Sequence, residues 1–89
     1  MQKIKVSNLL SRNGNFVANQ FTIRTDDSYL FQSYGSTIVK VKSGKVFLDE
    51  YYWNYSRTTS KYRNIFLNET TDETKRKIKD GEYQLTNLN

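Results

Sequence analysis

The segment that most constrains the fold is a run of alternating side chains on either side of Ser43-Gly44. Valine alternates with lysine before this dipeptide and apolar residues follow Lys45 after it, a period of two that is typical of half-buried strands. A two-residue turn at Ser43-Gly44 joins the strands as a β-hairpin and sets their register. The predicted cross-strand pairs are Lys42 with Lys45, Val41 with Val46, Lys40 with Phe47, and Val39 with Leu48. An antiparallel sheet is therefore expected, with valine and leucine on one face and the lysines around Phe47 on the other.

Further strands are predicted before and after this hairpin. Residues 16–25 alternate, with Val17, Phe21 and Ile23 on one parity and Gln20, Thr22 and Arg24 on the other. Asp26-Asp27-Ser28 predicts a turn, and the next strand begins at Tyr29 and turns or bulges at Tyr34-Gly35. Residues 83–85 fit a short final strand, whereas residues 4–10 fit either a strand or a short helix.

Helix signals occur only in the second half of the chain. Ser56, Thr58 and Thr59 are candidate N-caps for a helix of about three turns. Thr70-Thr71-Asp72-Glu73 matches a capping box, and the helix that it begins should stop at Gly81. The fold class predicted is α+β, a small antiparallel β-sheet with two short helices in the C-terminal half, in a single domain over residues 1–89.

Composition argues for a binding protein rather than an enzyme. The chain has no histidine and no cysteine, so it lacks an imidazole base, a thiol nucleophile and the usual zinc ligands. Its paired acids fit strand ends, a turn and a helix cap, and we expect no catalytic residue, no cofactor and no metal. A net charge of +5 favours acidic partners, and the absence of cysteine favours the cytoplasm. We expect no membrane association, because no stretch approaches the length of a membrane span.

The run from Tyr51 to Arg63 is the candidate contact surface. It holds five aromatic rings and three cations without a carboxylate, a composition that suits protein interfaces and nucleic-acid backbones. Strand alternation would place Tyr51, Trp53 and Tyr55 on one face and Tyr52 on the other, and Trp53 fits either the core or an interface. The predicted partner-binding residues are Tyr52, Arg57, Lys61 and Arg63.

Basic clusters elsewhere support an alternative, a nucleic-acid-binding accessory protein. Its phosphate contacts would come from the hairpin and from the second helix, through Lys40, Lys42, Lys45, Lys75, Arg76, Lys77 and Lys79. Helix-dipole compensation and solubility also explain the cations of the second helix, and Phe47 alone is a thin stacking platform.

Three motifs carry a resemblance to a known family: the NQF of residues 19–21, the FQSY of residues 31–34 and the W-x-YSRTT-x-KYR of residues 53–63. The chain resembles short, uncharacterised proteins carried by phages and conjugative elements of Gram-positive bacteria. This resemblance implies a setting, the host bacterial cytoplasm, rather than a mechanism. We expect inhibition of a host defence or nucleic-acid-processing machine by direct protein–protein association, as in an anti-CRISPR-type inhibitor. The partner would be a host protein or ribonucleoprotein complex, with direct contact to nucleic acid and homodimerisation left open.

Overall fold

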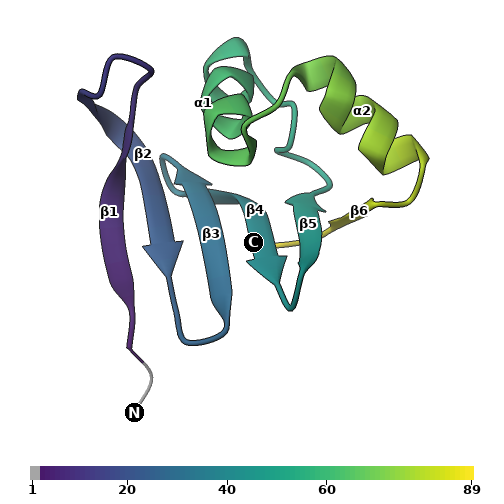
Figure 1. Ribbon diagram of the computed structural model, residues 1–89, viewed down its shortest axis with the longest axis horizontal. Helices are drawn as coiled ribbons and strands as arrows, with labels where there is room; N and C mark the ends of the chain where they lie inside the picture. Colours follow the sequence, from purple (N-terminus) through teal and green to yellow (C-terminus); the bar gives the residue numbers. More distant parts are fainter. Residues whose placement is uncertain (1–2) are drawn as a thin grey trace.

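The computed structural model describes residues 3–89 and shows an α+β fold, a six-stranded, mostly antiparallel sheet and two helices in the C-terminal half (Figure 1). The elements in chain order are β1 (Lys5–Leu10), β2 (Phe16–Arg24), β3 (Ser28–Ser33), β4 (Ser36–Lys42), β5 (Lys45–Asp49), α1 (Arg57–Leu67), α2 (Thr71–Lys79) and β6 (Tyr83–Thr86). The fold class predicted from the sequence is confirmed, and the ambiguous segment near the N-terminus is a strand. No helix in the described part of the chain is long and apolar enough to cross a membrane.

The first five strands form an antiparallel meander in which each strand pairs with its neighbours in the chain (Figure 1). The hairpin between β4 and β5 has the predicted register, from Lys42 opposite Lys45 to Val39 opposite Leu48. Ser43 and Gly44 both have positive φ, at 53° and 75°, which is the backbone of the tight turns whose twist matches paired strands. The backbone conformation of these two turn residues therefore sets the register of the β4–β5 hairpin.

The last strand joins the sheet differently. β6 runs parallel to β5, with Val46 opposite Tyr83 and Leu48 opposite Leu85. A parallel neighbour requires a crossover connection, and α1 and α2 together supply it. α1 lies over the middle of the sheet, where its Phe66 packs on β3, and α2 lies at the β6 side; β1 lies at the side of the sheet away from both (Figure 1).

Both helices begin at residues that the sequence marks as caps. Ser56 caps α1, with its side chain accepting a hydrogen bond from the Thr59 backbone N–H. Thr70 and Glu73 form the predicted capping box of α2, and each side chain accepts from the other residue's backbone N–H. α2 ends at Lys79, and Gly81 follows it with a φ of 83°, a left-handed conformation suited to glycine.

The core lies between the sheet and the helices. Phe31, Val39 and Leu48 are opposite one another on β3, β4 and β5, and all three are fully buried. Phe66 of α1 stacks on Phe31 and on Tyr29, with ring centroids 5.7 Å and 4.8 Å apart. The register between β3 and β4 shifts after Phe31, and Ile38, next to Val39, is also buried. We call this side of the sheet the helix-side face.

The other side of the sheet, which we call the open face, carries the residues of opposite parity. One row runs across all six strands and consists of Val6, Ile23, Leu30, Lys40, Phe47 and Gln84. On β2 the two parities are reversed from the usual arrangement: Phe21 and Ile23 lie on the open face, and Gln20 is 1% exposed on the helix-side face. The prediction of a half-buried strand is correct, but its polar parity is the one that faces the core.

Candidate partner-binding site

Three tyrosines gather in the segment between β5 and α1. Tyr52 lies between the other two, its ring centroid 4.7 Å from that of Tyr51 and 5.4 Å from that of Tyr55. Tyr51 and Tyr55 are 69% and 63% exposed, whereas Tyr52 is half-buried and packs against the core. The predicted strand alternation over these residues is wrong, because β5 ends at Asp49 and the tyrosines lie in turns. Because this segment folds back on itself, Tyr51, Tyr52 and Tyr55 meet although they have different parities. We call these three residues the tyrosine cluster.

Asp49 holds this segment in place. Its carboxylate is 1% exposed and accepts hydrogen bonds from the backbone N–H groups of Tyr51, Tyr52 and Leu88, at 3.1, 2.8 and 2.8 Å. Burial tends to raise the pKa of Asp49, but these hydrogen bonds outweigh it, and the net pKa lies below the usual value. The ionised carboxylate is therefore a structural anchor that positions the tyrosine cluster on the end of the sheet.

A pocket opens beside the tyrosine cluster. Its volume is about 240 Å³, and its lining consists of Ser33, Tyr34, Ser36, Ile38, Tyr52, Tyr55, Ser56 and Thr59. The wall combines aromatic rings and an aliphatic side chain with hydroxyl groups, and no charged residue contributes to it. At roughly 30 Å³ per water molecule, the volume suits one inserted side chain rather than a large cofactor.

Ser33 gives the pocket an unsatisfied polar group. Its side chain is buried, at 4% exposed, and its Oγ has no hydrogen-bond partner. Buried hydroxyls are nearly always paired, since leaving one unpaired costs about 1–3 kcal/mol. The Oγ is itself buried, so this hydroxyl belongs to the wall behind the pocket and does not face the pocket opening.

Two of the predicted contact cations lie next to this pocket along the chain. Arg57 and Lys61 follow the tyrosine cluster in the first turns of α1, are separated by one helical turn and are both exposed. Neither side chain forms an ion pair within residues 3–89, although the Lys61 Nζ lies 5.3 Å from the centroid of the Tyr62 ring. Both charges are therefore available to an acidic group outside the molecule.

Arg63, the fourth predicted contact residue, is fully buried, at 0% exposed. Its guanidinium donates to the Trp53 carbonyl and, at 3.0 Å each, to the side-chain oxygens of Asn64 and Thr71, and it lies 5.2 Å from the Trp53 ring centroid. Burial lowers the pKa of Arg63, and the nearby charge of Glu69 partly offsets this. The prediction that Arg63 contacts a partner is incompatible with this burial, since the side chain ties the Trp53 segment to the start of α2. Trp53 itself is half-buried against the core.

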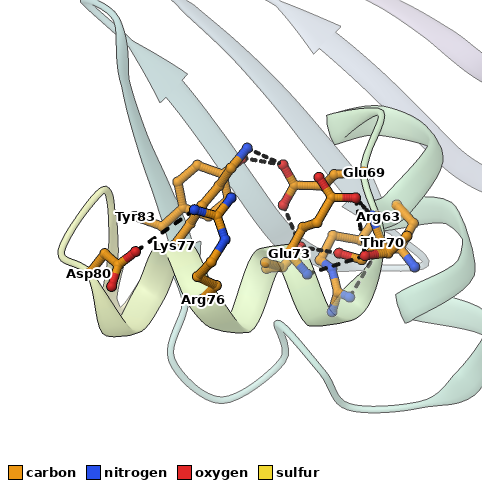
Figure 2. Close-up of polar contacts among 10 residues, drawn as sticks. Arg63, Glu69, Thr70, Glu73, Arg76, Lys77, Asp80 and Tyr83 are labelled. Atoms are coloured by element: carbon orange, nitrogen blue, oxygen red, sulfur yellow. Dashed lines mark hydrogen bonds and ion pairs between the residues drawn. The ribbon is translucent and has the colours of Figure 1, made fainter.

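Lys77 is also engaged inside the protein, in the cluster that Figure 2 shows. Its Nζ lies 2.8 Å from Glu69 Oε1, and Tyr83 donates its hydroxyl to the same oxygen at 2.6 Å. Burial alone would raise the pKa of Glu69, but hydrogen bonds from Lys77, Thr74 and Tyr83 hold it below its usual value. The hydrogen bond to Glu69 in turn raises the pKa of Lys77. This lysine fastens α2 to the preceding loop, so phosphate binding would break its ion pair.

The remaining cations of the alternative prediction fall into two groups that lie on opposite sides of the sheet. Lys40, Lys42 and Lys45 are on the open face, whereas α2, with its exposed Lys75, Arg76 and Lys79, covers the helix-side face. Lys42 pairs with Asp27 at 3.4 Å and Arg76 with Asp80 at 3.9 Å, both on the surface where such pairs contribute little. The structure therefore does not bring the two groups into one basic surface.

Sequence reasoning overlooked Ser33 and Tyr34 and assigned Tyr51 and Tyr55 to a strand. Tyr34 has a φ of 54° and is 61% exposed, so the turn predicted at Tyr34-Gly35 already indicated a ring held away from the core. No local signal indicated that this turn would face the segment before α1, because their meeting depends on the whole meander.

Fold and site together define a small α+β protein with a tyrosine-lined pocket, beside which Arg57 and Lys61 form no ion pair within residues 3–89. The chain belongs to a family of unknown function, DUF8033, whose model matches residues 4–82. No curated protein and no solved structure matches the chain.

Proposed function

We propose that this protein is a non-enzymatic binding protein that attaches to its partner through the tyrosine cluster and the adjacent pocket. The observation that carries the proposal is the exposure of Tyr51 and Tyr55 beside a partly apolar pocket. Tyrosine supplies a large, rigid contact area with a polar tip, and such residues dominate the affinity of many protein interfaces. The pocket would receive one side chain of the partner.

Arg57 and Lys61 supply the electrostatic part of this interface. Both lie outside internal ion pairs and are placed one helical turn apart, next to the pocket wall at Ser56 and Thr59. Unpaired rim cations steer an acidic surface into the correct orientation and raise the association rate. The partner patch is therefore acidic around a protruding aromatic or polar side chain.

For the biological role, we propose that the partner is a host defence enzyme or another nucleic-acid-processing machine in a bacterial cytoplasm. The support is the resemblance of residues 19–21, 31–34 and 53–63 to proteins of phages and conjugative elements, together with the basic charge of the chain. A protein with a net charge of +5 does not mimic DNA, so inhibition would act through an acidic surface of the machine or its bound RNA.

Capture from a host lysate tests this proposal. Tagged protein is immobilised, the lysate of a Gram-positive bacterium is passed over it with and without nuclease, and the bound proteins are identified by mass spectrometry. A protein retained after nuclease treatment supports direct protein association. Recovery of nucleic acid alone, or of proteins that disappear after nuclease treatment, would contradict it.

The alternative of a nucleic-acid-binding accessory protein keeps one favourable observation, the grouping of Lys40, Lys42 and Lys45 on the open face. A complex dominated by phosphate contacts loses affinity log-linearly as salt rises, with a slope that counts the contacts. Titration of an oligonucleotide at several salt concentrations, with substitution of these three lysines, tests it.

A further inference from the structure

The open face exposes an apolar surface that nothing in the described chain covers. Val6, Ile23 and Leu30 lie in one row across β1, β2 and β3, and Phe21 lies in the next row. Lys40 of β4 continues the first row and separates Leu30 from Phe47 of β5. Leu10 follows on the same side of β1 and pairs with Phe16 of β2. Both helices pack on the opposite side, through Phe66 against Phe31 and through Lys77 against Tyr83.

The exposure of these side chains is greatest on β1 and β2. Val6 is 58% exposed, Leu10 46% and Phe16 79%, while the residues further across the sheet are half-buried by one another. A sheet that carries helices on one face normally has polar residues on the other. Contiguous exposed apolar residues of this kind mark an interaction surface.

A buried polar residue on the core side of β2 also supports an interaction surface on the open face. Gln20 occupies a buried position there, and its Oε1 has no hydrogen-bond partner. The strand thus points a costly polar group at the core and its apolar side chains, Phe21 and Ile23, at solvent. Covering the open face would remove Phe21 and Ile23 from water and so stabilise this arrangement of β2.

We propose that the open face is covered by the open face of a second copy of this chain, giving a dimer of two sheets packed face to face between outer helix layers. Six strands at about 4.8 Å spacing and about 20 Å length cover a flat area of roughly 600 Å². The protruding side chains make the accessible area larger than this, so it comes near the ~800 Å² per partner of a standard interface. A two-fold axis would bring the apolar residues of β1, β2 and β3 of the two copies together, and twisted sheets pack face to face in this way in β-sandwiches.

The composition of the open face favours a protein layer over nucleic acid. Its rings are Phe16 and Phe21 on β2 and Phe47 on β5. The three strand spacings between β2 and β5 amount to about 14 Å, so Phe47 lies too far from the rings of β2 for successive bases to stack on them. Lys42 and Lys45 lie next to the hairpin turn, where they would form part of the charged rim of an interface. Lys40 lies between Leu30 and Phe47, and its aliphatic stem would pack in the interface while its ammonium group reaches the edge. The tyrosine cluster and its pocket lie towards the helices, so each copy of the dimer would present one binding site outward.

Sedimentation equilibrium of the full chain from micromolar to millimolar concentration tests the dimer. Each chain has a mass of 10.5 kDa, and the wild type should approach twice this value, with a dissociation constant that does not rise with salt. The double variant Val6→Glu/Ile23→Lys places opposite charges across β1 and β2 on the open face. It should raise the dissociation constant by about a hundredfold or more, because both charges would be buried in the dimer.

The matched control is Lys5→Glu, which places a glutamate opposite the exposed Arg24 and so gives the same pair of charges across β1 and β2 on the helix-side face. It should leave the dimer unchanged. Circular dichroism checks folding, and if the charged open-face variant is unfolded, Val6→Thr/Ile23→Thr replaces it, because threonine retains strand propensity.

Three results would overturn the proposal. The first is a wild-type mass of one chain at all concentrations, and the second is a dimer that survives the open-face substitutions. The third is a monomer that binds oligothymidylate and loses this binding in the open-face variant, which would assign the face to nucleic acid.

Discussion

Glu69 and Lys77 form an ion pair, with 2.8 Å between Oε1 and Nζ, that joins the loop after α1 to the last turns of α2 (Figure 2). The Glu69 side chain is 2% exposed and that of Lys77 24%. Tyr83 of β6 donates to the same carboxylate, so three separate elements of the crossover meet at one buried charge. The position of α2 on the sheet depends on this group.

Substitution of Glu69 by Gln should lower the free energy of unfolding by about 2–3 kcal/mol. The amide cannot accept from Lys77, Thr74 and Tyr83 together, and it leaves a half-buried ammonium without its counter-charge. Urea denaturation measures the change. Glu82→Gln removes an exposed carboxylate and should alter stability by less than about 0.5 kcal/mol. Equal effects of the two substitutions would contradict the assigned role of Glu69.

The stability of the protein should fall in acid through the same residue. The pKa of Glu69 lies below its ordinary value of 4.5 in the folded protein, so the ionised carboxylate stabilises the fold at pH values above 4.5. This contribution is lost as the pH falls below 4.5 and through the lower pKa of the folded state. Thermal unfolding followed from neutral pH to strong acid should show a smaller acid-dependent decrease for Glu69→Gln than for the wild type. Parallel curves for the two proteins would show that Glu69 does not titrate as described.

Arg63 should be required for folding rather than for binding. Arg63→Lys shortens the reach and removes the planar fork that contacts Trp53, Asn64 and Thr71 together, and we expect a loss of about 3 kcal/mol. Arg57→Lys, on the exposed side of the same helix, serves as the control and should stay within about 0.5 kcal/mol of the wild type. Chemical denaturation of both variants distinguishes a buried anchor from a surface contact.

Gln20→Met should stabilise the monomer unit by about 1 kcal/mol, because it replaces a buried, unpaired amide oxygen by an apolar group of similar length. Gln84→Met makes the same change at an exposed position of the open face, and at protein concentrations low enough to keep the chain monomeric it should have little effect. A loss of stability in Gln20→Met would show that the Gln20 amide makes a contact that the structure does not contain.

Local signals in the sequence were sufficient for most of the fold. The register of the β4–β5 hairpin follows from Ser43-Gly44, and the start of α2 follows from the reciprocal bonds of Thr70 and Glu73, since both depend on residues close in the chain. The parallel pairing of β6 with β5 has no such signal, because the path of two helices decides it.

The burial and neighbours of the candidate site residues were harder to predict from the sequence than the strands and helices. The physical reason differs from residue to residue. The composition of residues 51–63 indicated the segment that holds the tyrosine cluster, but it cannot distinguish an arginine that packs against Trp53 from one on the surface, as the contrast of Arg63 with Arg57 shows. On β2 the alternation was correct, yet periodicity does not state which face the helices will cover. Ser33 and Tyr34 joined the pocket through tertiary contacts alone.

The most direct test of the proposed binding site is a pair of charge reversals measured against the protein captured from lysate. Arg57→Glu/Lys61→Glu reverses both cations beside the pocket, and Lys75→Glu/Lys79→Glu makes the same change at the same helical spacing on α2, away from it. We expect the first variant to bind about tenfold or more weakly by isothermal titration calorimetry and the second to bind as the wild type does. Unchanged affinity in the first variant, or equal losses in both, would contradict the assignment of partner binding to the tyrosine cluster and its pocket.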